Sequence, residues 1–329
     1  MRFAKGHGTE NDFVILPDPE GSGGLTADLA VRLCDRRAGI GADGVLRVVR
    51  AAVAPVDGPG VAGAGVAGAG GPGGAVAPEW FMDYRNADGS LAEMCGNGIR
   101  VFARYLVQHG LAAGPEFTVA TRSGPRRVRI GADGDVTVDM GAVAVLGPGS
   151  AVVAGRTYQG LRVSVGNPHL ACLVDAPLAG LDLSRVPQLD PGLFPGGANV
   201  ELVQRTGPRS VAMRVHERGS GETRSCGTGA VAAAAAAAAA GTTAPGATAR
   251  GAAALAATAR GATARGATAP GVVGDGTWNV RVPGGDLTVT LEAGSAWLTG
   301  PAVIVAEGEL DPSWLAAGRL AGADPGPRR

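Results

Sequence analysis

Two near-identical stretches, Met94-Cys-Gly-Asn-Gly-Ile and Ser225-Cys-Gly-Thr-Gly-Ala, decide the fold of this chain. In both, a cysteine is followed by glycine, one polar residue and glycine, and the two cysteines are 131 positions apart (226 − 95). Each copy follows a strand-like segment and a turn. After the first copy, apolar residues at 99, 102, 105 and 106 keep a helical spacing. The repeat predicts two similar domains, each with a helix that begins near its cysteine.

The rest of the chain is rich in short alternating or apolar runs bounded by turn residues, a pattern typical of strands. These runs lie at 13–16, 44–49, 80–84, 116–121, 126–130, 136–140, 162–165, 170–174, 200–204, 211–216, 278–282, 287–291 and 302–306. A second helix is expected from about residue 229. Many strands and few helices predict an α/β (α+β) fold that is rich in antiparallel pairs.

Two segments of low complexity interrupt this pattern. Residues 55–78 consist of Gly, Ala, Val and Pro with one charged residue, Asp57, and residues 241–271 repeat Ala-Thr-Ala-Arg-Gly-Ala from Ala247, Ala257 and Ala262. Such segments cannot bury enough side-chain volume to offset the entropy lost on ordering the backbone. Both are therefore predicted to be insertions.

Charge and cysteine content exclude several classes of protein. Lys+Arg 29 equals Asp+Glu 29, so the chain lacks the basic surplus of an electrostatic nucleic-acid binder or a polybasic membrane-surface protein. The four cysteines, Cys34, Cys95, Cys172 and Cys226, form no C-x-x-C pair and have no zinc-ligand spacing with histidine. No signal peptide and no membrane-spanning run are recognised. We therefore expect a cytoplasmic protein with no metal, no organic cofactor, no nucleic-acid partner and no membrane partner.

A cysteine at a helix start has a chemistry of its own. The first amides of a helix bind anions such as a carboxylate, and the same terminus lowers a thiol pKa from about 8.5 into a range of about 3.5–7.5. Two such thiols on opposite sides of a carbon next to a carboxylate would invert it, one removing a proton and the other returning one. Buried structural cysteines in glycine-rich turns would give the same pattern, and the residues alone leave both interpretations open. Cys34 and Cys172 lie in apolar contexts and are assigned to the core.

Longer motifs accompany the two cysteines, and in order along the chain they resemble the diaminopimelate epimerase family. They are Phe3-Ala-Lys-Gly-His-Gly-Thr-Glu-Asn-Asp-Phe, Arg36-Arg-Ala-Gly-Ile-Gly-Ala-Asp-Gly, Tyr84-Arg-Asn-Ala-Asp-Gly-Ser, Ala92-Glu-Met-Cys-Gly-Asn-Gly-Ile-Arg, Gly166-Asn-Pro-His, Asn199-Val-Glu and Glu217-Arg-Gly-Ser-Gly-Glu-Thr-Arg-Ser-Cys-Gly-Thr-Gly-Ala. The resemblance implies two pseudo-symmetric domains, each a curled, mostly antiparallel sheet around a central helix. The domains would be 1–139 with 302–329, and 140–301.

The resemblance also implies an activity and roles for particular residues. The reaction would interconvert LL- and meso-2,6-diaminopimelate, in lysine and peptidoglycan precursor synthesis, without a cofactor and in a homodimer. The acid/base cysteines would be Cys95 and Cys226, with His169 and Glu217 beside the reacting centre. The substrate contacts would be Asn11, Asn86, Asn167, Asn199 and Arg218, together with the backbone of Gly96, Asn97, Gly227 and Thr228.

Two positions depart from the family pattern, and the residues leave three different functions open. Gly44 stands where some relatives carry Gln, and His216 where an aromatic residue is frequent. Proline and hydroxyproline racemases share this architecture and use two cysteines, but they need only a small pocket. The two cysteines are also consistent with a redox switch or with a non-catalytic ligand-binding module.

Overall fold

The computed structural model describes residues 1–55, 78–241 and 274–321. Nearly all of the two expected insertions, residues 56–77 and 242–271, lies outside these ranges. The chain divides into two compact units, Met1–Gly8 with Asp12–Gly131 and Ala302–Arg329, and Thr9–Asn11 with Ala132–Pro301. None of the described helices is long and apolar enough to cross a membrane.

Among the described residues, the sheet of the first unit has seven strands, each paired with the next. In order they are β18 (Val303–Glu309), β1 (Arg2–Gly8), β2 (Asn11–Pro17), β3 (Gly44–Arg50), β4 (Trp80–Asn86), β5 (Glu116–Ala120) and β6 (Arg126–Ile130). Its helices are α1 (Ala27–Cys34), η1 (Ala51–Val53), α2 (Gly96–Gln108) and α5 (Pro312–Ala321). Strands β2–β3 and β4–β5 pair in parallel, whereas β1–β18, β3–β4 and β5–β6 pair antiparallel.

Helix α2 is the centre of the first unit. Its apolar side chains Ile99, Phe102 and Leu106 are fully buried, and α2 packs on β1, β3, β4, β6 and β18. Arg100 is fully buried as well. The helical spacing of the apolar residues is the reason that this segment is a helix, and the sheet curls around the face that they form.

The second unit repeats this arrangement with a longer sheet. Its strands are, in order, β7 (Val136–Ala142), β17 (Ser295–Gly300), β16 (Gly285–Glu292), β15 (Gly276–Val282), β13 (Ser210–Glu217), β12 (Asn199–Gly207), β10 (Pro168–Leu173), β9 (Arg156–Ser164), β8 (Ala144–Val153) and β11 (Gln188–Leu189), with β14 (Gly221–Thr223) paired to β13. Its helices are η2 (Leu178–Gly180) and α3 (Gly227–Ala239).

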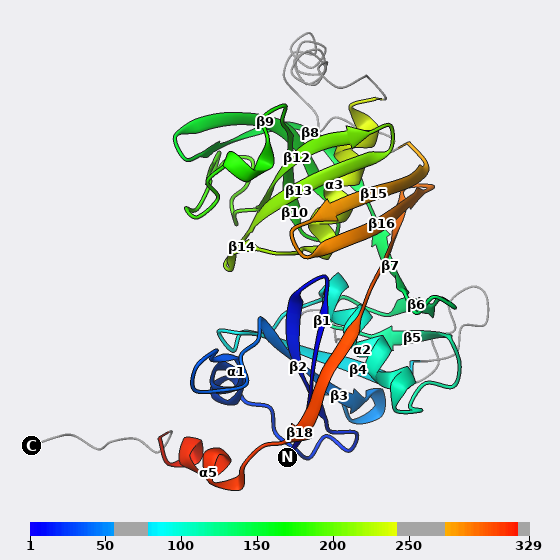
Figure 1. Cartoon of the computed structure of the whole chain (residues 1–329), viewed down its shortest axis with the longest axis vertical. Helices are drawn as coiled ribbons and strands as arrows, with labels where there is room; N and C mark the ends of the chain where they lie inside the picture. Colours follow the sequence, from blue (N-terminus) through cyan, green and yellow to red (C-terminus); the bar gives the residue numbers. More distant parts are fainter. Residues whose placement is uncertain (56–77, 242–273, 322–329) are drawn as a thin grey trace, which may run out of the picture. The chain divides into compact units, whose positions relative to one another are not determined.

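Helix α3 is apolar on every side, as a helix surrounded by a sheet must be. All its residues from Gly227 to Ala237 are buried, and in Figure 1 it lies among the strands of the second unit. The alanine run that follows Gly229 is too short to be a membrane helix. Its small side chains instead let β9, β10, β12, β13, β15 and β16 approach the helix closely.

The two units share one order of strand pairing. In the first, β2–β3 is parallel, β3–β4 antiparallel, β4–β5 parallel and β5–β6 antiparallel. In the second, β10–β12, β12–β13, β13–β15 and β15–β16 follow the same sequence of orientations. The helix with the cysteine motif follows the third strand of each series, β4 or β13. The predicted fold class, two similar units each with a curled sheet around a central helix, is confirmed.

A charge cluster fastens β2 to the turn before β3 in the first unit. The carboxylate of Asp12 accepts hydrogen bonds from Lys5 Nζ at 2.6 Å and from Arg36 at 2.8 and 3.1 Å. It also accepts the backbone N–H of Asp43 at 3.2 Å. Burial alone would raise the pKa of Asp12, but the hydrogen bonds and charges of Arg36 and Lys5 outweigh burial and lower this pKa from 3.8 to about 2.

This cluster predicts a pH-dependent loss of stability in Asp12→Asn. Because the folded-state pKa is depressed, the contribution is complete above about pH 4 and is lost as the pH falls through about 2. Urea unfolding should show a loss of about 2 kcal/mol at pH 7 and about half of that at pH 3. Glu20→Gln, at an exposed carboxylate of the same unit, is the control and should change little. An equal loss at both pH values would contradict the assignment.

Candidate active site

Cys95 and Cys226 occupy the same structural position, the N-cap of the central helix of each unit. The backbone of Cys95 is extended (φ −140°, ψ 119°) and its Sγ accepts the Gly98 N–H at 3.3 Å. Cys226 has φ −127° and ψ 117°, and its Sγ accepts the Gly229 N–H at 3.4 Å. Each sulfur thus lies beside the first amides of a helix, which have no partner within the helix and attract anions.

The residues that follow each cysteine are enclosed by their unit. Gly96, Asn97, Gly227 and Thr228 are all buried. At the end of β4, Asn86 donates its side-chain N–H to Ser90 Oγ at 3.0 Å in the turn after the strand. Asn11, the first residue of β2, is 8% exposed and groups with the second unit.

Most of the predicted site residues of the second unit form one hydrogen-bonded network. Its centre is His169, whose Nε2 lies 3.0 Å from Asn167 Oδ1 and whose Nδ1 lies 2.7 Å from Glu201 Oε1. On one side, Asn167 Nδ2 reaches Thr228 Oγ1 at 3.4 Å, and that hydroxyl lies 3.5 Å from Cys226 Sγ.

Asn199 extends the network to Arg218. The Asn199 amide nitrogen is 3.5 Å from His169 Nδ1, and its oxygen accepts the backbone N–H of Arg218 at 2.8 Å. The guanidinium of Arg218 is exposed and donates to the Gly196 carbonyl at 3.2 Å. Asn199 therefore holds the backbone of Arg218, and the exposed guanidinium remains able to bind an anion.

Strand register explains why these residues meet. The parallel pair β10–β12 aligns His169 with Asn199, although the two residues are 30 positions apart. Side chains two positions apart on a strand share a face, so Glu201 lies on the same face as Asn199. Glu217 comes from the end of β13, the next strand in the sheet.

Glu217 is bound to the cysteine at the helix start. Its carboxylate accepts hydrogen bonds from the Thr223 hydroxyl and from the Cys226 thiol. Burial raises the pKa of Glu217, and the charge of Glu201 raises it further. The hydrogen bonds from Thr223 and Cys226 and the charge of His169 act in the opposite direction without cancelling the rise.

The thiol pKa of Cys226 shifts in the direction opposite to the sequence-based expectation. A helix start alone should lower it, but burial raises it well above its usual value and the charges of Glu217 and Glu201 add to the rise. Hydrogen bonds from Thr228 and from the Gly229 N–H lower it only in part. A helix terminus supplies about half a unit charge, which does not offset removal from water beside two carboxylates. Cys226 is therefore a thiol in this structure.

The other two cysteines are structural, as predicted. Cys34 is 5% exposed in the core around α1, and burial raises its pKa to about 11. Cys172 is fully buried in the core between β10 and β12, and burial raises its pKa as well. Both lack the solvent access of a reactive cysteine.

The two departures from the family pattern have local explanations. A Cβ on Gly44 would come within 2.6 Å of Cε2 of Tyr84 and 2.7 Å of the Arg85 carbonyl, so β4 leaves no room for a side chain there. The His216 ring is buried and its Nδ1 lies 2.9 Å from the Leu183 carbonyl. Neighbours on a strand face opposite sides, so His216 fastens β13 to this loop while Glu217 faces the cysteine.

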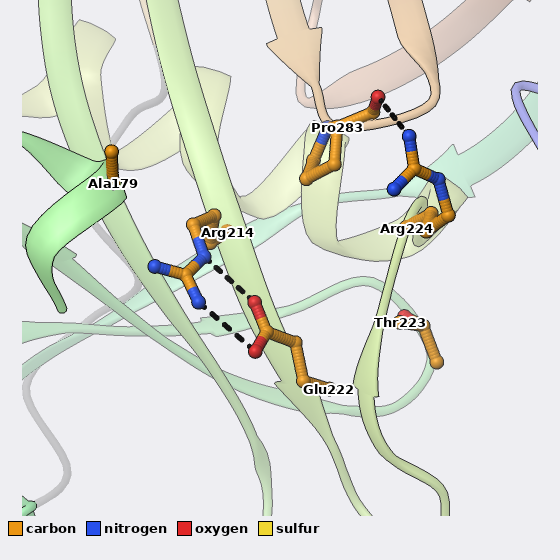
Figure 2. Close-up of a pocket in the computed structure, with 6 residues that line it drawn as sticks. All are labelled: Ala179, Arg214, Glu222, Thr223, Arg224 and Pro283. Carbon is orange, nitrogen blue, oxygen red and sulfur yellow. Dashed lines mark hydrogen bonds and ion pairs between the residues drawn. The ribbon is translucent and has the colours of Figure 1, made fainter. Parts of the chain in front are cut away.

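The sequence interpretation missed Glu201 and Thr223. Glu201 ends the motif Asn199-Val-Glu, and a carboxylate among the apolar residues of β12 was itself a signal. Thr223 also lines a hollow of about 480 Å³ together with Ala179, Arg214, Glu222, Arg224 and Pro283. Figure 2 shows both arginines of this hollow already engaged, Arg214 with the two oxygens of Glu222 and Arg224 with the Pro283 carbonyl.

Comparison with known proteins agrees with this geometry. The family model described as diaminopimelate epimerase matches residues 3–146 and 161–261. A diaminopimelate epimerase from Thermobifida fusca is 54% identical over 312 residues, covering 94% of this chain and 98% of the relative. One from Rhodococcus jostii is 49% identical over 322 residues, with 95% and 98% covered.

Solved structures of lower identity share the fold. A probable proline racemase from Agrobacterium radiobacter has a TM-score of 0.56 at 14% identity, with 94% of this chain and 93% of that chain covered. A hydroxyproline epimerase from Agrobacterium vitis has a TM-score of 0.53 at 14% identity, with 95% and 94% covered. The chain has a cysteine at the N-cap of each central helix, shares the fold of these structures and has relatives of this identity over nearly its whole length. It therefore belongs to the diaminopimelate epimerase family.

Proposed function

We propose that this isomerase interconverts LL- and meso-2,6-diaminopimelate by a two-base mechanism in which Cys95 and Cys226 exchange protons with one α-carbon. The observation that carries the proposal is the equivalence of the two sulfurs, each an N-cap that accepts the amide N–H three residues ahead. Two equivalent acid/base groups are what a reaction needs when its forward and reverse directions are mirror images of one another at the reacting carbon.

In one direction, Cys95 acts as the base and Cys226 as the acid. The Cys95 thiolate takes the α-proton, and the electron pair left on carbon delocalises into the substrate carboxylate. The Cys226 thiol then delivers its proton to the opposite face. In the reverse direction the roles exchange. The network around Cys226 supports this assignment, because its thiol is the protonated form in the structure.

The helix-start amides would stabilise the charge that develops on the substrate. Those of Gly96, Asn97, Gly227 and Thr228 lie in the first turns of α2 and α3, where a carboxylate is favoured. Because the enediolate carries more negative charge on these oxygens than the ground state does, the same amides lower the barrier.

Glu217 and His169 would complete the reacting end of the site. When Cys226 gives up its proton, the new thiolate lies next to the Glu217 carboxylate that its S–H bound. A proton that Glu217 takes up from solvent, favoured by its raised pKa, would then be shared with the thiolate and relieve that repulsion. We assign both residues to orienting the substrate amino group as well, with Asn167 and Thr228 holding the His169 side of the network.

The far end of diaminopimelate would be bound by Arg218 with the amides of Asn11, Asn86 and Asn199, whereas Asn167 would contact the substrate at the reacting end. A guanidinium pairs with a carboxylate through two parallel hydrogen bonds. The exposed guanidinium of Arg218, on a backbone fixed by Asn199, is suited to this role. A proline racemase would have no use for such a distant cation.

Arg218→Ala is expected to raise the KM for LL-diaminopimelate by about 10- to 100-fold, since it removes a charge-assisted bidentate contact. The change in kcat should be smaller, because Arg218 binds remote from the reacting carbon. Steady-state kinetics on Arg218→Ala and on Arg205→Ala, whose guanidinium binds the carbonyls of Ala237 and Gly241, separate recognition from a general loss of charge. An unchanged KM in Arg218→Ala would remove Arg218 from the binding site.

The proposed reaction is tested with the purified chain under reducing conditions. LL-diaminopimelate should be converted to a mixture with the meso isomer, and L-proline should remain unchanged. Turnover of proline alone would favour the racemase alternative. If neither compound is converted, a binding module is favoured. We also propose that the protein is cytoplasmic and forms a homodimer. Light scattering of the purified protein tests the dimer, because it gives the molar mass in solution.

A further inference from the structure

We infer that Glu201 is a positioning residue that holds the His169 ring in a fixed orientation beside Cys226. The inference rests on the proposed function, since it assigns a role within the same site. Glu201 lies near the start of β12, beside the first turn of α3, and its side chain is fully buried. Nothing in the sequence interpretation gave it a role.

The contacts around His169 fix the orientation of its ring. Nδ1 lies 2.7 Å from Glu201 Oε1, and Nε2 lies 3.0 Å from the amide oxygen of Asn167. The nitrogen of the Asn167 amide reaches Thr228 Oγ1 at 3.4 Å, and the amide nitrogen of Asn199 lies 3.5 Å from Nδ1. Contacts on both ring nitrogens therefore hold the plane of the ring, and Glu201 makes the shortest of them.

Within the described ranges, the carboxylate of Glu201 uses only one of its two oxygens for hydrogen bonding. Its Oε1 bonds to His169, whereas the buried Oε2 has no hydrogen-bond partner among the described residues. A buried carboxylate with one oxygen unsatisfied costs stability. The bond from Oε1 to His169 is therefore the contact through which Glu201 can act in the site.

Glu201 also lies close to the helix start that carries the thiol. A Cβ built on Gly229 would lie 2.9 Å from Glu201 Oε1 and 3.3 Å from Cys226 Sγ. The titratable groups around Glu201 are His169 and Cys172 from β10, Glu217 from β13 and Cys226 at the start of α3. Its negative charge helps to keep the Cys226 thiol protonated, ready to act as the acid.

The consequence for catalysis has a definite sign. Removing the charge of Glu201 while keeping its shape loosens the His169 ring and makes the Cys226 thiol easier to ionise. In the direction that uses Cys226 as the acid, kcat should then fall at a lower pH than in the wild type. Glu201→Gln is expected to lower kcat by about 10- to 100-fold and to move the alkaline limb of the kcat profile down by about half a pH unit or more.

The experiment compares Glu201→Gln, Glu201→Asp, His169→Asn and the double variant Glu201→Gln/His169→Asn in the full chain. Glu292→Gln, an exposed carboxylate of the same unit, is the matched control. If Glu201 acts through His169, the double variant is no slower than His169→Asn alone, and Asp restores part of the activity and of the pH profile. Additive losses in the double variant would overturn the inference.

A second measurement is independent of turnover. The chain has four histidines, so nitrogen NMR of the ring resonances, assigned with His169→Asn, reports the surroundings of His169 separately. Glu201→Gln should shift the His169 ring resonances and leave those of the other histidines unchanged. Unchanged His169 resonances in Glu201→Gln, with an active wild-type enzyme, would overturn the inference and leave the epimerase function intact, whereas a wild type without epimerase activity would overturn the function itself.

Discussion

Cys95→Ser and Cys226→Ser are each expected to lower epimerisation of LL-diaminopimelate by about a thousandfold, within the range of about 10² to 10⁴ for general acid–base groups. A serine hydroxyl keeps the N-cap hydrogen bond, so each helix should still start at the same residue. It is far too weak an acid to shuttle the proton near neutral pH. The loss is therefore predicted to lie in catalysis and not in folding.

The two variants also separate one-base from two-base chemistry. With one thiol left, the α-proton can still be removed from the face that this thiol serves and returned to the same face. Exchange of the α-hydrogen with deuterated water should then persist slowly for one stereoisomer without inversion. Cys34→Ala, in the core around α1, is the control and should retain full activity. Normal epimerisation in both serine variants would eliminate the two-base mechanism.

Gly229→Ala is expected to lower activity by about 100-fold and stability by about 1–3 kcal/mol. A Cβ at this position would meet Glu201 Oε1 at 2.9 Å and Cys226 Sγ at 3.3 Å. The carboxylate cannot move aside, because it is fully buried and bound to His169. The methyl group would therefore displace either the Glu201–His169 pair or the thiol.

Gly98→Ala is the matched control, because Gly98 has the same position in the first copy of the motif. A Cβ there would meet Cys95 Cβ and Leu46 Cδ2, both at 3.3 Å, and Cys95 Sγ at 3.6 Å, and none of these three nearest atoms belongs to a carboxylate. Apolar neighbours can shift by a few tenths of an ångström, so this variant should lose less activity and less stability. Urea unfolding and kinetics of both variants test the difference, and a larger loss in Gly98→Ala would contradict the placement of Glu201.

The sequence predicted those parts of the fold that depend on local pattern. The cysteine repeat indicated two similar units, and the alternating runs correspond to strands of the sheets. Helix α1 was missed because it has only 8 residues, although Thr26 at its N-cap accepts the Leu29 N–H at 3.1 Å and was a readable start signal. Strand β8 was missed because Gly147, Pro148 and Gly149 within it suggest a turn.

The site was predictable in its members and not in its electrostatics. Motif resemblance pointed to His169, Asn199 and Glu217, and the structure joins all three to the start of α3. The direction of the thiol pKa of Cys226 depends on how deeply that helix start is buried and on which carboxylates the strand register brings beside it. Glu201 is 25 positions away in sequence (226 − 201), so no local pattern could have placed it there.

Early turnover of LL-diaminopimelate in deuterated water tests most directly whether two sulfurs serve one stereocentre. Analysed by mass spectrometry before the reaction reverses, the meso product should carry one deuterium at the inverted carbon while the remaining substrate carries none. This follows if one cysteine removes the protium and the other delivers a proton that has equilibrated with solvent. Product that retains its original hydrogen at that carbon would show transfer by a single base and contradict the account.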